Sequence, residues 1–193
     1  MPYDPRAVAN YILIVRQHFG YQTTQLELQK LLYFCHGLYL VRFNEALVEG
    51  YFEAWDHGPV HPLIYREFRD FGSMPISRRS SSTNLITGES KLIPPPAEQR
   101  AKTLIAETVL QLRNLTASQL RKKSHVNGGA WHSIKESAKV NLASQVRIPD
   151  SVIRERYHRH ILPMGDLGEL DDVIEDFPPE PNRPSEQRGT SND

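Results

Sequence analysis

The sequence predicts a mainly α protein: a compact helical domain around one central buried helix, with a small β-hairpin and a partly disordered acidic C-terminal tail. Three observations predict this fold class. Residues 26–41, LELQKLLYFCHGLYLV, are apolar on nearly every side while keeping helical spacing, so other helices must enclose them. Apolar residues recur at helical spacing in much of the chain up to residue 162, which indicates six or seven helices around this one. Beyond that point, acidic residues and prolines dominate.

The central helix has a well-marked start. Thr24 is followed three positions later by Glu27, the spacing of a capping box, in which each side chain satisfies one unpaired backbone N–H of the first turn. We therefore expect the helix to begin near Gln25. At about 1.5 Å per residue the stretch is roughly 25 Å long. Its interspersed polar residues make it unsuitable for a membrane span, so it is expected to lie in a water-soluble core.

The first helix is expected to precede this one, with Asp4 as its N-cap and Pro5 as its first residue. Proline suits that position because it has no N–H to leave unpaired. Gly20 is a natural stop. The buried stripe between them is expected to contain Val8, Tyr11, Ile12, Val15 and Phe19.

After the central helix, Asn44 suits a turn, and residues 47–55 are aromatic enough to be extended. Gly58 and Pro59 predict a turn, and Pro62 can open a helix that ends at Gly72. The Ser- and Pro-rich stretch 73–96 contains two apolar pairs, 85–86 and 92–93. A turn over residues 87–90 between these pairs predicts the small hairpin.

Three further helices follow at residues 97–114, 118–125 and 131–140. Ser118 is the expected cap of the second, and the pair Gly128-Gly129 separates the second from the third. Ile148 and Pro149 read as extended, before a last helix capped by Asp150 that runs through Tyr157.

The composition is that of an ordinary globular chain of 193 residues, 39% hydrophobic and 24% charged. We expect one domain over residues 1–162 and an acidic, proline-rich tail over 163–193. The tail carries nine acidic residues against two arginines, a net charge of −7, which leaves the preceding part basic by the same amount. No signal peptide is expected, and the single Cys35 excludes a disulfide framework, which favours a cytoplasmic location.

Four blocks of the sequence carry a resemblance: LQKLLYFCHGLYL at 28–40, FEAWDHGPVHPLIY at 52–65, residues 118–131, and IPDSVIRERY at 148–157. Together they resemble the Panacea domain, the family of SocA-like antitoxins and phage-associated proteins, over roughly residues 5–160. The resemblance implies a bacterial antitoxin domain that neutralises a cognate protein toxin by contact. It also implies a proteolytic adaptor that delivers the toxin to a ClpXP-type AAA+ protease. The acidic end after Leu162 is not part of that pattern.

Enzymatic alternatives centre on Asp56, His57 and His61, which could form a metal site or an acid–base group of a metal-dependent hydrolase. Such residues around a turn more commonly make structural hydrogen bonds, and no other ligand cluster shares a usable spacing. Cys35 and His36 are adjacent on a helix and so point about 100° apart, and burial raises the pKa of a thiol. We therefore expect no enzyme and assign no catalytic, cofactor-binding or metal residue, and no cofactor.

A DNA-binding transcriptional regulator is the other alternative. The basic runs at 78–79 and 121–123 could meet phosphate. Short basic runs are usually solvated faces, however, and no helix-turn-helix or zinc-finger pattern strengthens this interpretation. The same positive charge could equally attract an acidic partner protein. Nucleic acid is thus a possible but not a favoured partner, and no membrane contact is expected.

Partner-binding residues are expected at two turns and in the tail, because aromatic side chains dominate most interfaces. Both tryptophans could instead belong to the core. In the tail, apolar residues at near-helical spacing in an acidic background are typical of a segment that orders on binding, although a docked terminal helix would look the same. The candidates are Trp55, His57, His61 and Tyr65 at the first turn, Trp131 and His132 at the second, and Leu170 and Ile174 in the tail.

Overall fold

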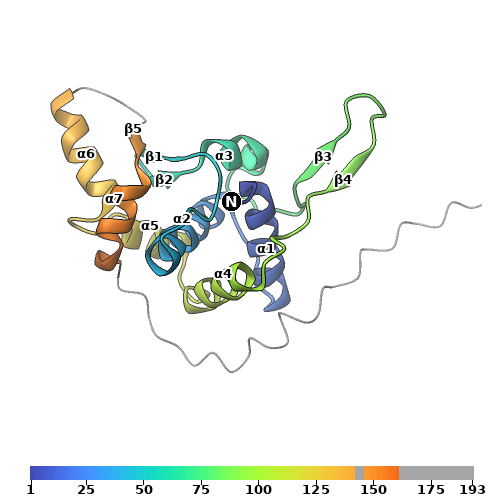
Figure 1. The fold of residues 1–193 in the computed structure, drawn as a ribbon, viewed down its shortest axis with the longest axis horizontal. Coiled ribbons are helices and arrows are strands. Elements are labelled where there is room, and N and C mark those ends of the chain that lie inside the picture. Colours follow the sequence, from blue (N-terminus) through green and yellow to red (C-terminus); the bar gives the residue numbers. More distant parts are fainter. Residues whose placement is uncertain (142–145, 161–193) are drawn as a thin grey trace, which may run out of the picture.

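The computed structural model describes residues 1–141 and 146–160, and for 138–141 only the backbone. Helix α2 (Gln25–Phe43) lies at the centre. The helices α1 (Pro5–His18), α4 (Gln99–Gln111), α5 (Ala117–Ser124) and α7 (Asp150–Arg156) pack against it (Figure 1). Apolar side chains from every side of α2 are buried, which confirms the prediction of a mainly helical domain around this segment. The predicted tail, 163–193, lies outside the described residues.

Both N-terminal helices begin as predicted. The Asp4 carboxylate accepts from the N–H of Arg6, ahead of Pro5 at the first helical position. At α2 the capping box is complete: Thr24 N donates to Glu27 Oε2 at 2.8 Å, and Glu27 N to Thr24 Oγ1 at 3.4 Å. Asn44 ends α2 in the left-handed conformation, φ 55°, which asparagine tolerates well. The two helices pack on each other.

A three-stranded antiparallel sheet, in the order β2-β1-β5, packs on α2 through β2 and through Phe52 of β1. It consists of β1 (Phe52–Trp55), β2 (Gly58–Val60) and β5 (Val146–Ile148). The extended conformations predicted for 47–55 and at 148 are confirmed in part, but Gly58 and Pro59 lie in β2, and Asp56 and His57 form the turn. Pro59 is tolerated there because β2 is an edge strand. In register, Trp55 pairs with Gly58 and Phe52 with Ile148.

The predicted helix from Pro62 is present as α3 (Pro62–Phe68), continued by a short 3₁₀ turn, η1 (Arg69–Phe71), to Gly72. The hairpin is also present, but its strands are β3 (Ser81–Thr83) and β4 (Ser90–Leu92). The predicted strand residues Leu85 and Ile86 instead occupy its tip. Both strands begin earlier than expected: Thr83 pairs with Ser90, and Asn84 Oδ1 then accepts from Ile86 N and Thr87 N, which places the apolar pair in the loop.

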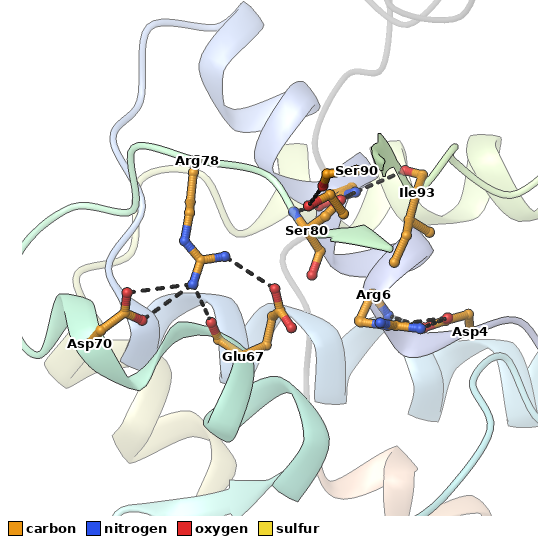
Figure 2. Close-up of polar contacts among 10 residues, drawn as sticks. Asp4, Arg6, Glu67, Asp70, Arg78, Ser80, Ser90 and Ile93 are labelled. Carbon is orange, nitrogen blue, oxygen red and sulfur yellow. Dashed lines mark hydrogen bonds and ion pairs between the residues drawn. The ribbon is translucent and has the colours of Figure 1, made fainter. Parts of the chain in front are cut away.

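The base of the hairpin is fixed to the helical body by one buried side chain. Asn10 on α1 accepts from Ser80 N at 2.7 Å and donates to Ser80 O and Ile93 O at 2.9 and 2.8 Å. Arg78 adds a second attachment: its guanidinium reaches the side chains of Glu67 and Asp70, as Figure 2 shows beside the bonds at Ser80 and Ile93. The hairpin therefore projects from a firmly held base (Figure 1).

The C-terminal helices differ from expectation in their starts. α5 is capped by Thr116, whose side chain forms a capping box with Gln119, rather than by Ser118. α6 runs over Ala130–Asn141, close to the prediction. Asp150 is the first residue of α7 and does not cap it, because its carboxylate instead meets Nε2 of His36 at 3.2 Å. A 3₁₀ turn, η2 (Tyr157–Arg159), follows.

Within the described ranges, no helix combines the length and the apolar character needed to cross a membrane.

Candidate functional site

One side of α2 carries polar side chains that bind the backbone of residues 59–65. Lys30 Nζ donates to Pro59 O at 2.7 Å, Gln29 Oε1 accepts from His61 N at 2.8 Å, and Gln25 Nε2 donates to Tyr65 O at 2.9 Å. Gln25 and Gln29 lie one turn apart and Lys30 follows directly, so together they satisfy backbone groups of β2 and of the first turn of α3. The polar residues in this otherwise apolar helix therefore hold the segment after β1 in place.

Lys30 is fully buried, and no described carboxylate pairs with it. Burial, with a smaller contribution from the positive charge of Arg121, lowers the pKa of its ammonium to about 7. The amino group can donate to the Pro59 carbonyl whether it is charged or neutral. Its place in the structure is that of a structural hydrogen-bond donor.

Two buried histidines make similar structural bonds. The ring of His36 accepts at Nδ1 from Val48 N at 3.4 Å, so Nε2 carries the proton toward Asp150. His61 meets Glu49 O through Nε2 at 2.9 Å, and burial lowers its pKa, which favours the neutral ring. Phe52 packs against both rings. The histidines thereby join α2, the 47–50 segment and β2.

The turn between β1 and β2, residues 55–58, which we call the corner, is held against α5 and α6. Trp131 Nε1 donates to Trp55 O at 2.7 Å, and one helical turn later Lys135 reaches Asp56 at 2.8 Å. The Trp131 ring in turn stacks on His125, with ring centroids 3.7 Å apart and an angle of 9° between the ring planes. Two residues of one helix face therefore fix both sides of the corner.

Gly58 completes the corner because no larger residue fits there. Its φ is +99°, a conformation that side chains disfavour. A Cβ at this position would lie 2.7 Å from Ser124 Oγ and 2.9 Å from both His125 Nε2 and Lys30 Nζ. Three polar side chains from α2 and the α5 end thus converge on the bare backbone of this glycine.

The structure brings together four of the residues predicted to bind a partner. Trp55 and Tyr65 pack ring to ring at 4.7 Å, Trp131 binds the Trp55 carbonyl, and the side chain of His57 is exposed at the corner. His132 follows on α6 and is half-buried. His61 lies inside, at 3% exposure, so it is not a surface residue. Leu170 and Ile174 lie outside the described residues.

The residues considered for enzymatic chemistry are held apart. Asp56 is fully exposed and pairs with Lys135, whereas His61 is buried against Glu49. In the described ranges no three His, Cys, Asp or Glu side chains are grouped so that they could hold a metal ion. Burial raises the pKa of the Cys35 thiol, as the sequence predicts, so this group is a poor nucleophile.

Two surface features were not identified from the sequence. The hairpin tip presents Leu85 and Ile86 at 97% and 96% exposure. A pocket of about 560 Å³ lies between α5 and the end of the described chain. Its lining is rich in Lys, Arg and His side chains, and we call it the basic pocket. The apolar pair 85–86 and the basic run 121–123 are visible in the sequence, but the exposure of the pair and the approach of Arg159 to the run are not.

Comparison with known proteins shows the family of the chain. The family model for "Antitoxin SocA-like, Panacea domain" matches residues 28–132, more than half of the sequence. Antitoxin SocA of Caulobacter vibrioides (strain NA1000 / CB15N) is 38% identical over 176 residues, which are 91% of this chain and 94% of that protein. The chain belongs to the SocA-like antitoxin family. No solved structure matches it.

The Panacea-domain match begins on α2 and ends on α6, so it contains Gln29 and Lys30 from the polar side of α2, the corner and Trp131. The elements that close the domain lie beyond it. The hydroxyl of Tyr157 donates to Phe34 O at 2.7 Å, and its ring packs so closely on Gly37 that a Cβ there would lie 2.3 Å away. The relationship to Antitoxin SocA, which spans most of the chain, includes this closing segment within its coverage.

Proposed function

We propose that this protein is a cytoplasmic antitoxin that binds and neutralises a cognate protein toxin, and that it is a binding protein and not an enzyme. The observation that carries the proposal is the 38% identity to Antitoxin SocA over nearly the full length of both chains. The described side chains support it, because the buried polar groups around the corner bond to backbone and are not arranged around a reactive group.

The corner is the surface we propose for toxin contact. Trp55, Tyr65 and Trp131 supply large ring area, and His57 and His132 flank them. The rings are pre-positioned, because Trp55 is fixed by Glu53 and through its carbonyl by Trp131. Rigid, partly exposed aromatic side chains lose little entropy on binding, which is why they dominate interface energetics.

The test of function is a growth assay with the reading frame next to this gene. Induced alone, the neighbouring product is expected to stop growth, and co-expression of this protein is expected to restore it. Co-purification of the two proteins then establishes direct contact. Unchanged toxicity in the presence of this protein, or a strongly salt-dependent DNA mobility shift without any bound protein, would contradict the antitoxin role.

Substitutions at the exposed His57 and the half-buried Tyr65 test whether the corner is the surface that binds the toxin. The double variant His57→Ala/Tyr65→Ala is expected to weaken toxin binding at least about tenfold, which corresponds to about 1.4 kcal/mol. Leu85→Ser/Ile86→Ser serves as the matched control, because it alters two exposed residues at the hairpin tip, distant from the corner in Figure 1. If the hairpin-tip variant weakens toxin binding and the corner variant does not, the contact surface is the hairpin, and the antitoxin role still holds.

We further propose that neutralisation proceeds by delivery of the toxin to a ClpXP-type AAA+ protease. The support is the family resemblance, in which SocA-like proteins act as proteolytic adaptors. A chase experiment distinguishes this from simple occlusion: the toxin is expected to disappear quickly only when both this protein and the protease are present. A stable toxin that is nevertheless harmless would show that occlusion alone is sufficient.

A further inference from the structure

We infer that the basic pocket binds the acidic segment 163–177 of the same chain. The pocket is formed by the end of α5, the α5–α6 connection and η2, and has a volume of about 560 Å³. Five of its seven polar lining residues are Lys, Arg or His, two are amides, and no described residue that lines it is acidic. Two apolar residues complete it. The lining residues are Leu115, Gln119, Lys122, Lys123, His125, Val126, Asn127, Arg159 and His160.

Two of the cations that line the pocket have no ionic partner among the described residues. Lys122 and Arg159 are exposed, and neither forms an ion pair with a described carboxylate. Some exposed arginines elsewhere on this molecule do have such partners, as Arg78 does with Glu67 and Arg100 with Glu45. Lys122 and Arg159 come from segments far apart in sequence, so the fold itself brings these like charges together. Such an arrangement is stabilised by an anionic ligand.

The charge and position of segment 163–177 make it the best occupant. It contains six acidic residues and no basic residue, and Leu167, Leu170 and Val173 alternate with them. The described chain ends at His160, which itself lines the pocket. Asp166 lies six positions after His160, and at most about 3.6 Å per residue gives a reach of roughly 20 Å. The first acidic groups are therefore tethered within reach of the cations.

Tethering also favours this segment over an acidic segment of another protein. A short tether gives an effective concentration of the order of millimolar, above that of a free cellular partner. Each exposed ion pair contributes only about 0.2–1 kcal/mol, so tethering is what allows contacts this weak to fill the pocket for part of the time. An external acidic ligand would have to displace the segment first, so the proposal describes an internal competitor at this surface.

The experiment uses the full chain and needs no toxin, so its outcome is independent of the proposed antitoxin role. A fluorophore is attached at Gly168→Cys, while the buried Cys35 stays unlabelled. At low salt the anisotropy of the dye is expected to be high, because the segment is held. It should fall as NaCl rises from about 50 to about 500 mM. The pocket variant Lys122→Glu/Arg159→Glu is expected to remove most of this salt-sensitive part.

A charge swap and a matched control make the result specific. Adding Asp166→Lys/Glu169→Lys to the pocket variant is expected to restore the anisotropy, because the attraction is re-formed with reversed signs. The control Arg69→Glu/Lys91→Glu makes the same change in net charge at two exposed sites away from the pocket, and should leave the anisotropy unchanged. If the anisotropy changes neither with salt nor in the pocket variant, the proposal is wrong. If the pocket variant weakens toxin binding but leaves the anisotropy unchanged, the pocket binds the toxin and not the segment 163–177.

Discussion

At the residue scale, the buried Lys30 gives the protein a pH-dependent stability. The folded pKa of about 7 lies below the unfolded value of 10.5, so above pH 7 the unfolded chain binds more protons. The free energy of unfolding should therefore rise between pH 7 and about 8.5, by at most about 1.4 kcal/mol per pH unit. Above that range, ionisation of Cys35 and the tyrosines in the unfolded chain opposes the gain.

Urea unfolding at several pH values measures how the free energy of unfolding changes with pH, and Lys30→Met should flatten this slope. An equal slope in the variant would assign the effect to other groups.

Substitution of Gly58 separates the cost of steric crowding at the corner from the cost of a positive φ. Gly58→Ala is expected to destabilise the protein by about 2–4 kcal/mol, because it adds a clash with three side chains to the strain of a positive φ. Gly20→Ala is the control: its φ is +77°, but nothing lies within 4 Å of the added Cβ, so only the conformational strain of about 1–2 kcal/mol remains. Equal losses in the two variants, measured by denaturant unfolding, would show that Ser124, His125 and Lys30 yield without cost.

At the element scale, the helix starts show how far local patterns reach. The capping rule predicted α2 correctly, because of the two adjacent threonines only Thr24 has a glutamate three positions later. At α5, Thr116 and Ser118 both have suitable side chains, and the pairing of Thr116 with Gln119 decides between them. Asp150 is a good N-cap by type, but its carboxylate bonds to a histidine 114 residues away. Tertiary contacts of that kind leave no local signal.

The two candidate caps of α5 can be separated by substitution. Thr116→Ala is expected to cost about 1 kcal/mol of unfolding free energy, since it removes the acceptor for Gln119 N. Ser118→Ala lies inside the helix, where alanine is the better helix former, and should be neutral or slightly stabilising. A loss at position 118 and none at 116, in thermal or urea unfolding, would move the start of the helix to the sequence-based position.

The hairpin was predicted, but not its register or its attachment. Periodicity favoured strands that contain the apolar pairs, whereas the attachment depends on Asn10, 70 residues before Ser80. Asn10→Ala should leave Ser80 N, Ser80 O and Ile93 O without their partner and cost about 2–4 kcal/mol. Hydrogen exchange should accelerate at Ser80 N and along β3–β4 before it does in α2. Ser81→Ala, which removes only an exposed hydroxyl contact, is the control. Unchanged exchange in the Asn10 variant would mean that Arg78 alone holds the hairpin.

At the scale of the whole molecule, the helical core was predictable and the sheet was not. The all-round apolar character of α2 requires a surrounding layer, so the general arrangement follows from one segment. Strands β1, β2 and β5 have three or four residues each, too few for a period of two to be recognised, and β5 pairs with β1 across some 90 residues. The corner was singled out by its unusual residues, but its contact with α6 through Trp131 and Lys135 is a property of the assembled chain.

The closing C-terminal segment makes the assembled protein sensitive to acid. Burial lowers the pKa of His160 to about 4, and that of His125 moves the same way through burial and the charge of Lys30. Both rings are neutral when folded but become protonated below about 6.5 when unfolded, so stability should fall as the pH drops from 6.5 to 4. His160, the more buried, contributes up to about 1.4 kcal/mol per pH unit.

Its ring bonds Lys123 O and faces Tyr33, so protonation should release η2 from α2 before α2 and α4 separate. Hydrogen exchange at pH 5 and 7 would show this order, with His160→Gln reducing the acid loss and the exposed His158→Gln as control. Simultaneous exchange in η2 and α4 would mean that the domain opens as one unit.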